Sequence, residues 1–318
     1  MPCWTRWVEK RNNMGVRNID FTVIIPQRNS LGTLPRLFAS IPESESIEII
    51  LIDNSPEPLS RADIGIDREY ELLWSPPERH AGGARNAGLD HAHGKWLVFA
   101  DADDYFTPQA FDIFYRNIDR EEDIIYYCAE SVYDDTGAAS SRADRYNMNV
   151  RRFNAGEIRP IELAIGFKVP WAKMVRKSLV DDHSLRFDEV RASNDAFFSV
   201  LAGYYARKAA AEEMAVYTVT TSRGSLTKNI SYEVIHARFL VNLRINAFLK
   251  EHGLSDLQQS VGYFFYIALK HYPLKLFPMI KEAASYKQGL LVGSHRWGAS
   301  LKHVRKSHRD DAKYFISK

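Results

Sequence analysis

The feature that most restricts the possible folds of this chain is a short apolar run that ends in a cluster of acidic residues. Residues Trp96–Ala100 read Trp-Leu-Val-Phe-Ala, which is short and apolar enough to predict a buried strand. The run is followed at once by Asp101-Ala102-Asp103-Asp104. Carboxylates at the end of a buried strand repel one another, and a divalent cation such as Mg²⁺ or Mn²⁺ compensates for this repulsion. The alternative interpretation is a polar turn that caps the next helix.

The segment before this strand surrounds a basic residue with glycines. This segment carries Arg85 and Asn86 and continues into a predicted short helix within residues 80–93. The glycines of this segment are Gly82, Gly83 and Gly88. Their spacing does not fit the GxGxxG pattern of dinucleotide-binding proteins, and the chain has no P-loop. We expect the glycines to let the backbone approach a phosphate or a base, with Arg85 contacting the diphosphate or the base.

Strand and helix patterns alternate along the first half of the chain. Apolar runs predict strands at Phe21–Pro26, Ile47–Ile52, Glu71–Trp74 and Asp123–Cys128. A helix capped by Thr33 and stopped by Pro42 lies between the first two strands. This alternation indicates an open α/β sheet, in which ligands bind beyond the carboxyl ends of the strands. Asp53, at the end of the second strand, is therefore a candidate for ligand binding, and its alternative role is to start the turn into Pro56.

Five segments of the chain, in order, resemble those of family 2 glycosyltransferases. The segment Arg85-Asn86-Ala87-Gly88, followed by a strand and Asp-Ala-Asp-Asp, is similar to the nucleotide-sugar motif of that family. The first strand and its end, the segment 167–178 with Trp171 and Lys173, the segment 185–198 and the segment 217–227 also match. Two positions depart from the family pattern. Arg28 stands at an aromatic position, and Asn194 replaces a glutamate before Asp195.

The resemblance, which covers about residues 20–228, implies the glycosyltransferase A fold. This is an α/β fold with a mostly parallel, Rossmann-like sheet and flanking helices, followed here by a C-terminal helical extension. The expected boundaries are a polar lead-in at 1–19, a catalytic domain at 20–230 and a basic helical extension at 231–318. Within the catalytic domain, the nucleotide half covers about 20–104 and the acceptor half about 105–230.

The resemblance also implies an inverting, metal-dependent transfer of a hexosyl group. The donor is a nucleotide diphosphate sugar, with a UDP-sugar favoured, and the acceptor is a hydroxyl of a growing glycan or lipid-linked saccharide in polysaccharide biosynthesis. Asp195 is expected to be the general base, and Asp103 to hold Mn²⁺ or Mg²⁺ with Asp101 on the ribose or the metal. The implied nucleotide-sugar site comprises Pro26, Asn29, Asp53, Asn54, Arg85, Asp101, Ala102, Asp103, Trp171 and Lys173.

Several of these residues have a structural alternative. Trp171 is either a sugar platform or a buried core tryptophan, and Lys173 either faces a phosphate or is solvated. Ser193 or Asn194 is the expected N-cap of the helix that begins at Ala196. Two other classes of protein stay open, a non-catalytic protein that binds nucleotide sugars or carbohydrates and a sugar-1-phosphate nucleotidyltransferase. The second class normally has a glycine- and arginine-rich loop after the first strand, which residues 26–32 fit poorly.

The second half of the chain predicts a loop and then helices. The polar stretch 134–149 predicts a loop and is a candidate cover for the site. Apolar residues repeat at helical spacing from Val234 to Phe248, and Gly253 ends that run. Ser255 with Gln258 predicts a capping box for a helix that reaches residue 270 and stops before a proline.

Composition and charge restrict the location and the partners. The chain has 318 residues, 45% of them hydrophobic and 26% charged, with a net charge of +2 that does not indicate nucleic-acid binding. Its two cysteines, Cys3 and Cys128, suit a reducing compartment. No apolar run approaches the about 20 residues that cross a bilayer, and the N-terminus lacks a signal-peptide pattern, so we expect a cytoplasmic protein.

The end of the chain is basic. From Lys281 onward, nine basic residues stand against three acidic ones, an excess of +6. With Trp297 and Tyr314, this charge predicts a peripheral contact with the inner face of a membrane. The alternatives are a surface that packs on a second subunit and one that stays solvated.

Overall fold

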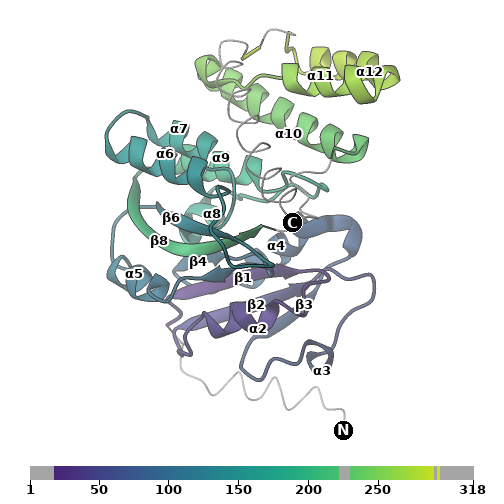
Figure 1. The fold of residues 1–318 in the computed structure, drawn as a ribbon. Helices are drawn as coiled ribbons and strands as arrows, with labels where there is room; N and C mark the ends of the chain where they lie inside the picture. Colours follow the sequence, from purple (N-terminus) through teal and green to yellow (C-terminus); the bar gives the residue numbers. More distant parts are fainter. Residues whose placement is uncertain (1–17, 222–229, 290–291, 294–318) are drawn as a thin grey trace.

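The computed structural model describes residues 18–221, 230–289 and 292–293. Its centre is an eight-stranded sheet with the strand order β3-β2-β1-β4-β7-β6-β8-β5 (Figure 1). The strands are β1 (Phe21–Gln27), β2 (Ile47–Asp53), β3 (Glu71–Trp74), β4 (Trp96–Phe99), β5 (Tyr105–Phe106), β6 (Ile124–Tyr133), β7 (Lys173–Arg176) and β8 (Ala209–Thr221). Four of the seven pairings between neighbouring strands are parallel and three are antiparallel. The predicted α/β fold is confirmed, with a mixed sheet.

The parallel part of the sheet places the polar strand ends along one edge. β1 pairs in parallel with β2 and β4, and β2 pairs in parallel with β3. In this register Gln27 lies beside Asp53, and Asp53 lies beside Trp74. β1 is buried along its whole length, as the apolar run predicts. The predicted strands of the first half are confirmed, with ends that differ by a few residues.

Helices cover the sheet and form the extension. The helices of the sheet domain are α2 (Leu34–Ala39), α3 (Arg61–Ile64), α4 (His80–His91), α5 (Ala110–Arg116), α6 (Asp144–Asn154), α7 (Pro160–Gly166), α8 (Lys177–Asp182) and α9 (Ala196–Tyr205), with a 3₁₀ turn at Pro77–Arg79. The predicted C-terminal helices are α10 (Tyr232–Glu251), α11 (Gly262–His271) and α12 (Pro273–Ser285). Figure 1 shows these three stacked at the opposite end of the molecule from α2 and α3.

One apolar cluster attaches the extension to the sheet domain, and a second holds the extension together. Ala196 and Val200 of α9 pack with Val241, Ile245 and Phe248 of α10. The other side of α10 packs against α11 and α12 in a separate cluster. α10 is therefore buried on two sides, which accounts for its long run of apolar residues.

Two predicted elements are wrong. The stretch 134–149 contains the beginning of α6, because Tyr146 and Val150 stand four residues apart and are both buried. The helix expected from Ser255 is a 3₁₀ turn at Ser255–Leu257, and α11 begins only at Gly262. Between them, the side chain of Asn246 donates to the carbonyl of Gln259 at 2.7 Å and accepts from its N–H at 2.7 Å, which holds this backbone out of a helix.

Among the described residues, no helix is both long and apolar enough to cross a membrane. Trp297, Tyr314 and most of the basic residues counted after Lys281 lie outside the described residues.

Candidate active site

The acidic residues after β4 form a tight turn held by β8. The N–H of Asp104 donates to the carbonyl of Asp101 at 3.0 Å, which closes the turn. The N–H of Asp101 donates to the hydroxyl of Tyr217 at 2.8 Å. The carboxylate of Asp104 is buried and accepts from the N–H of Thr220 at 2.7 Å and from its hydroxyl at 3.2 Å. Of the three carboxylates, that of Asp104 therefore stabilises the turn by bonding to β8.

The other two carboxylates of this turn lie nearer to solvent. Asp103 is exposed, and its backbone carbonyl accepts from Arg36 at 2.7 Å and from the hydroxyl of Thr220 at 2.8 Å. Loss of hydration and the charge of Asp101 raise the pKa of Asp103. Burial and the charges of Asp103 and Asp101 raise the pKa of Asp104 well above its usual range. Burial and the neighbouring charges therefore oppose the ionisation of Asp103 and Asp104, and a cation would favour it.

The residues of the turn fit a divalent cation in part. Asp103 offers hard oxygen ligands at the surface, while one oxygen of Asp101 is bonded to Arg85. Within the described ranges, no three histidine, cysteine, aspartate or glutamate side chains are grouped so as to enclose a metal ion. The protein side chains would therefore supply one or two ligands, and the remaining positions suit water or substrate phosphate.

Arg85 connects this turn to a second acidic residue far away in the sequence. It lies on α4 and is only 5% exposed. Its Nη2 donates to Oδ1 of Asp101 at 2.6 Å, and its Nη1 donates to Oδ1 of Asn194 at 2.8 Å. Its Nε is buried and has no hydrogen-bond partner in the structure. The guanidinium also lies 5.4 Å from the ring centre of Phe187.

Asp195 follows Asn194 directly and is the N-cap of α9. Its carbonyl accepts from the N–H of Ser199 at 3.0 Å, and its side chain makes no capping hydrogen bond. The prediction that Ser193 or Asn194 caps this helix is wrong, because the amide oxygen of Asn194 is bonded to Arg85. A carboxylate at this position gains from the helix dipole and stays available to a ligand.

The charges around Asp195 act on its pKa in both directions. Loss of hydration raises the pKa of Asp195 above its usual range, and the negative charge of Asp101 raises it further. The positive charges of Arg85 and Lys173 lower it in part. A carboxyl with a raised pKa is a stronger base once ionised.

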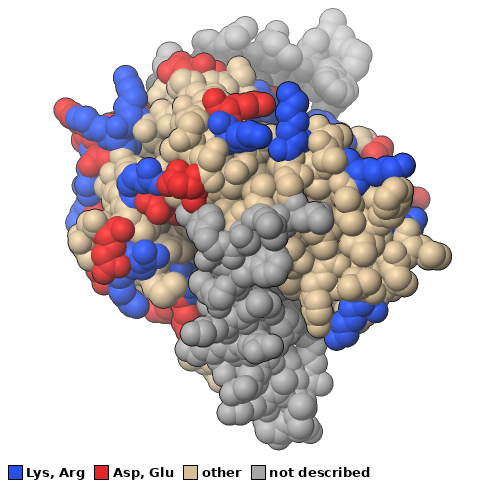
Figure 2. All heavy atoms as spheres, turned by 90° about the horizontal axis from the view of Figure 1, so that it is seen from above, with Lys and Arg blue, Asp and Glu red and all other residues tan. Residues whose placement is uncertain are grey.

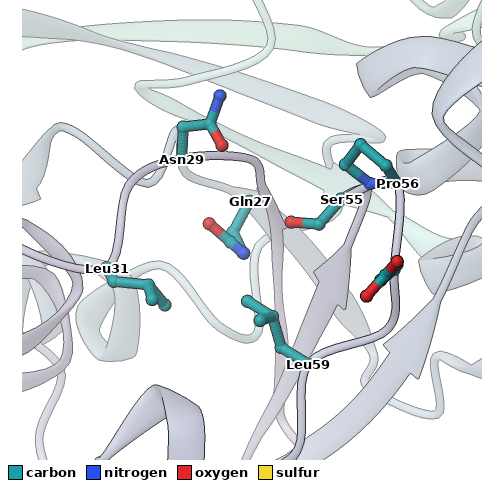
Figure 3. A pocket seen from close by; sticks show the side chains of 7 residues that line it. Gln27, Asn29, Leu31, Ser55, Pro56 and Leu59 are labelled. Carbon is teal, nitrogen blue, oxygen red and sulfur yellow. The ribbon is translucent and has the colours of Figure 1, made fainter.

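A shallow pocket of about 340 Å³ lies at the ends of β1 and β2 (Figure 3). It is lined by Gln27, Asn29, Leu31, Ser55, Pro56, Glu57 and Leu59. In Figure 3 the hydroxyl of Ser55 points toward Gln27, which lies between Asn29 and Leu59. Of these lining residues the sequence predicted Asn29, but it did not predict Gln27 or Ser55. A glutamine at the end of an otherwise apolar strand is the pattern that could have indicated Gln27.

Asp53 and Asn54 lie behind this pocket. Asp53 is fully buried, and its carboxylate accepts from the side chain of Gln27 at 2.9 Å and from the backbone N–H groups of Ser55 and Leu59 at 3.0 and 2.8 Å. Asn54 donates to the carbonyls of residues 75 and 76 at 3.0 and 2.8 Å. Both side chains fix the strand ends and the loop, so Gln27 and Ser55 stand between Asp53 and a ligand.

Two further predicted site residues are buried backbone positions. Pro26 lies inside β1. Ala102 is 4% exposed, and its carbonyl accepts from the hydroxyl of Thr33 at 2.7 Å, which ties the acidic turn to the start of α2. Both residues shape the edge of the sheet through the backbone.

Trp171 and Lys173 do not have the exposed positions that a contact with the donor needs. Trp171 is 1% exposed and stacks on Tyr217, with ring centres 5.7 Å apart. Lys173 is 2% exposed and donates to the carbonyls of Phe167 and Val169 at 2.6 and 2.7 Å. Burial lowers the pKa of Lys173 to about 7. Trp171 is thus the buried core tryptophan of the two alternatives and not a sugar platform. Lys173 is neither solvated nor at the surface, and it contributes a charge near Asp195 from within the fold.

The glycines of α4 serve packing, which differs from the expected approach to a phosphate. A Cβ on Gly82 would lie 1.9 Å from the backbone oxygen of Asp188, and one on Gly88 would lie 2.6 Å from Cγ2 of Ile24. A Cβ on Gly83 would lie 2.4 Å from Arg79. The glycines let α4 lie close to β1 and to the segment that precedes Asp195, which brings Arg85 within reach of Asn194.

Comparison with known proteins places the chain among sugar-transferring enzymes. Residues 22–184, just over half of the 318 residues, match the family described as Glycosyl transferase family 2. EpsH of Bacillus subtilis (strain 168) is 24% identical over 224 residues, which are 66% of this chain and 62% of EpsH. The succinoglycan biosynthesis protein ExoO of Rhizobium meliloti (strain 1021) is 24% identical over 258 residues, which are 76% of this chain and 71% of ExoO.

A solved structure shares the fold. The crystal structure of S. aureus TarS 1-349 in complex with UDP-GlcNAc aligns with a TM-score of 0.61 and 17% sequence identity, over 84% of this chain and 81% of that one. At this identity the likeness shows the fold alone.

Proposed function

The chain belongs to glycosyl transferase family 2, and we propose that it transfers a sugar from a nucleoside diphosphate donor to a hydroxyl group of a growing glycan, with inversion at the anomeric carbon. We favour a UDP-sugar as the donor, since the fold is shared with a protein whose solved structure contains UDP-GlcNAc. We favour an acceptor in polysaccharide biosynthesis because ExoO, by its name, acts in the biosynthesis of succinoglycan.

The contact of Arg85 with two distant segments supports this proposal most. One guanidinium bonds Asp101, at the end of β4, and Asn194, the residue before Asp195. An inverting transfer needs a base on one side of the anomeric carbon and a site for the departing diphosphate on the other side. In this proposal the acidic turn and Asp195 supply these two functions, and Arg85 links the two segments through its neighbouring terminal nitrogens.

Asp195 is the base in this proposal. Its carboxylate takes the proton of the acceptor hydroxyl while the hydroxyl oxygen attacks the sugar. The raised pKa of Asp195 brings its basicity nearer to neutral pH, and the charges of Arg85 and Lys173 favour its ionised form. Its place at the start of α9 fixes the backbone that carries it.

The acidic turn holds the donor in this proposal. Asp103, with Asp101, would hold Mn²⁺ or Mg²⁺, which when bound neutralises charge on the leaving diphosphate. Asp103 presents its carboxylate at the surface. The pocket at the ends of β1 and β2 would take the nucleoside, with Gln27, Asn29 and Ser55 at its surface and Asp53 and Asn54 behind them.

A panel of nucleotide sugars tests the proposal. The thermal midpoint of the protein is measured with several UDP-sugars and with GDP-mannose, each with Mn²⁺ and with a chelator, and nucleotide release is then followed with candidate glycan acceptors. We expect a UDP-sugar to raise the midpoint, Mn²⁺ to enlarge the shift, and Asp103→Ala to lose the effect of Mn²⁺. Equal shifts in chelator would contradict the metal role. Donor binding without turnover on any acceptor would favour a non-catalytic binding protein.

A further inference from the structure

The helices α11 and α12 expose large apolar side chains to solvent. Leu274 is 90% exposed, Phe277 64%, Leu269 61% and Tyr266 57%. Each helix carries two of them three residues apart, which places the two on one side of that helix. The opposite side of the two helices is already packed against α10. The exposed side chains therefore add nothing to the core, and they form what we call the α11–α12 face.

The exposed charged side chains that these two helices and the residues after them carry have one sign. From residue 262 to residue 289, the exposed charged residues of the structure are Lys270, Lys275, Lys281 and Lys287. The one acidic residue in this span, Glu282, is half-buried and pairs with His236 at 2.8 Å. Figure 2, which views the molecule from above, shows a broad tan surface without charged side chains, bordered by blue side chains and a few red ones. The face thus combines an apolar centre with a basic margin.

We propose that the α11–α12 face docks on a membrane surface that carries anionic headgroups. Leucine and aromatic side chains of this kind bury their apolar parts at the boundary between headgroups and acyl chains. The lysines around them can extend their ammonium groups to the phosphates while their stems lie along the apolar surface. Lys281 already lies over the ring of Phe277, with Nζ 4.8 Å from the ring centre.

The charge of this face argues against two other binding partners, a second copy of the chain and the chain's own C-terminal residues. A two-fold dimer formed through it would bring Lys270, Lys275 and Lys281 against the same residues of the second copy, and like charges across an interface are unfavourable. The chain's own end, residues 290–318, carries seven lysines and arginines against two aspartates, so its charge has the same sign as the face. An anionic surface matches both the face and the chain end that follows it.

Co-sedimentation with vesicles tests this proposal. The full-length protein is mixed at low salt with vesicles of phosphatidylcholine, with and without phosphatidylglycerol. Two variants change the face: Leu274→Ser with Phe277→Ser, and Lys270→Ala with Lys275→Ala and Lys281→Ala. Two matched controls change exposed residues elsewhere, Met148→Ser on α6 and Lys208→Ala before β8. Thermal melts check the fold, and light scattering measures the oligomeric state.

We expect the full chain to bind anionic vesicles and to be released by salt, because the lysines act through screened charge. Each lysine removed should weaken binding about fivefold, so the triple variant loses about a hundredfold. The apolar variant should also lose binding, and both controls should bind as the unchanged protein does. The proposal is overturned if the folded full chain does not bind anionic vesicles, or if both face variants bind them as well as the controls do. It is also overturned if light scattering shows a dimer that the apolar variant dissociates.

Discussion

Arg85 lies at the centre of the candidate site and acts on both of its halves. The guanidinium is almost fully buried, and it is bonded to one charged partner, Asp101, and to one neutral partner, Asn194. A glutamate at position 194 would have given it a second negative partner. With asparagine there, more of the positive charge of Arg85 is left to act on Asp195, whose pKa it lowers.

The substitution Arg85→Gln removes this charge, and its effect on pH dependence can be predicted. The base must be ionised, so kcat/KM falls as pH decreases through the pKa of Asp195. Without the charge of Arg85 that pKa rises further, and we expect the acidic limb of the pH profile to move to higher pH. Arg85→Lys keeps the charge and serves as the control, with a smaller displacement. A limb that stays in place or moves to lower pH in Arg85→Gln would contradict the assignment of Asp195 as the base.

At the scale of elements, the close packing of α4 brings Arg85 to its partners. Gly82 faces the backbone of Asp188, and a Cβ there would meet the carbonyl oxygen at 1.9 Å. A backbone atom cannot move aside as the end of a side chain can, so either the helix or the segment before Asp195 would have to shift. The geometry of the site therefore depends on a residue that touches no substrate.

Gly82→Ala is expected to lower both stability and activity. We expect a loss of about 1–3 kcal/mol in the free energy of unfolding, as for other overpacked sites. Turnover should fall as well, because Asn194 and Asp195 follow the displaced backbone. Urea unfolding and initial rates measure the two effects. Gly32→Ala is the control, since a Cβ there meets nothing within 4 Å, and it should stay within about 0.5 kcal/mol of the unchanged protein. Equal stability of the two variants would show that α4 tolerates a wider spacing.

Local patterns in the sequence predict most of the strands and helices. Where a prediction from these patterns fails, the reason is a contact between residues that are distant in the sequence. The strand β1 was expected from its continuous apolar run and is observed at Phe21–Gln27. The bond from Arg85 to Asn194 joins residues 109 positions apart, and no local pattern encodes it. The extended backbone at 258–260 likewise depends on Asn246, a residue of the preceding helix. Burial of Lys173 was also beyond the sequence, because its neighbours at the start of β7 come from other parts of the chain, whereas for Trp171 burial was one of the two alternatives that the sequence left open.

At the scale of the whole molecule, the helical extension is fastened to the segment that carries the base. Arg244 of α10 pairs with Asp188, and Arg191 pairs with Glu233 at 2.7 Å. The apolar contacts of α9 with α10 add to these links. The predicted boundary near residue 230 therefore separates two parts that share a core, and the extension supports the helix that begins after Asp195.

The proposed role of Asp195 as the general base is the central claim, and it rests on the positions of the acidic turn, Arg85 and α9. The most direct test is the turnover of Asp195→Asn beside the unchanged protein, with the donor and acceptor found in the nucleotide-sugar panel. Asparagine keeps the size of the side chain but cannot accept the proton. We predict a loss in turnover of about 10²-fold or more, with donor binding and thermal midpoint preserved. Near-normal turnover in a folded Asp195→Asn that binds the donor would contradict the account and place the base elsewhere.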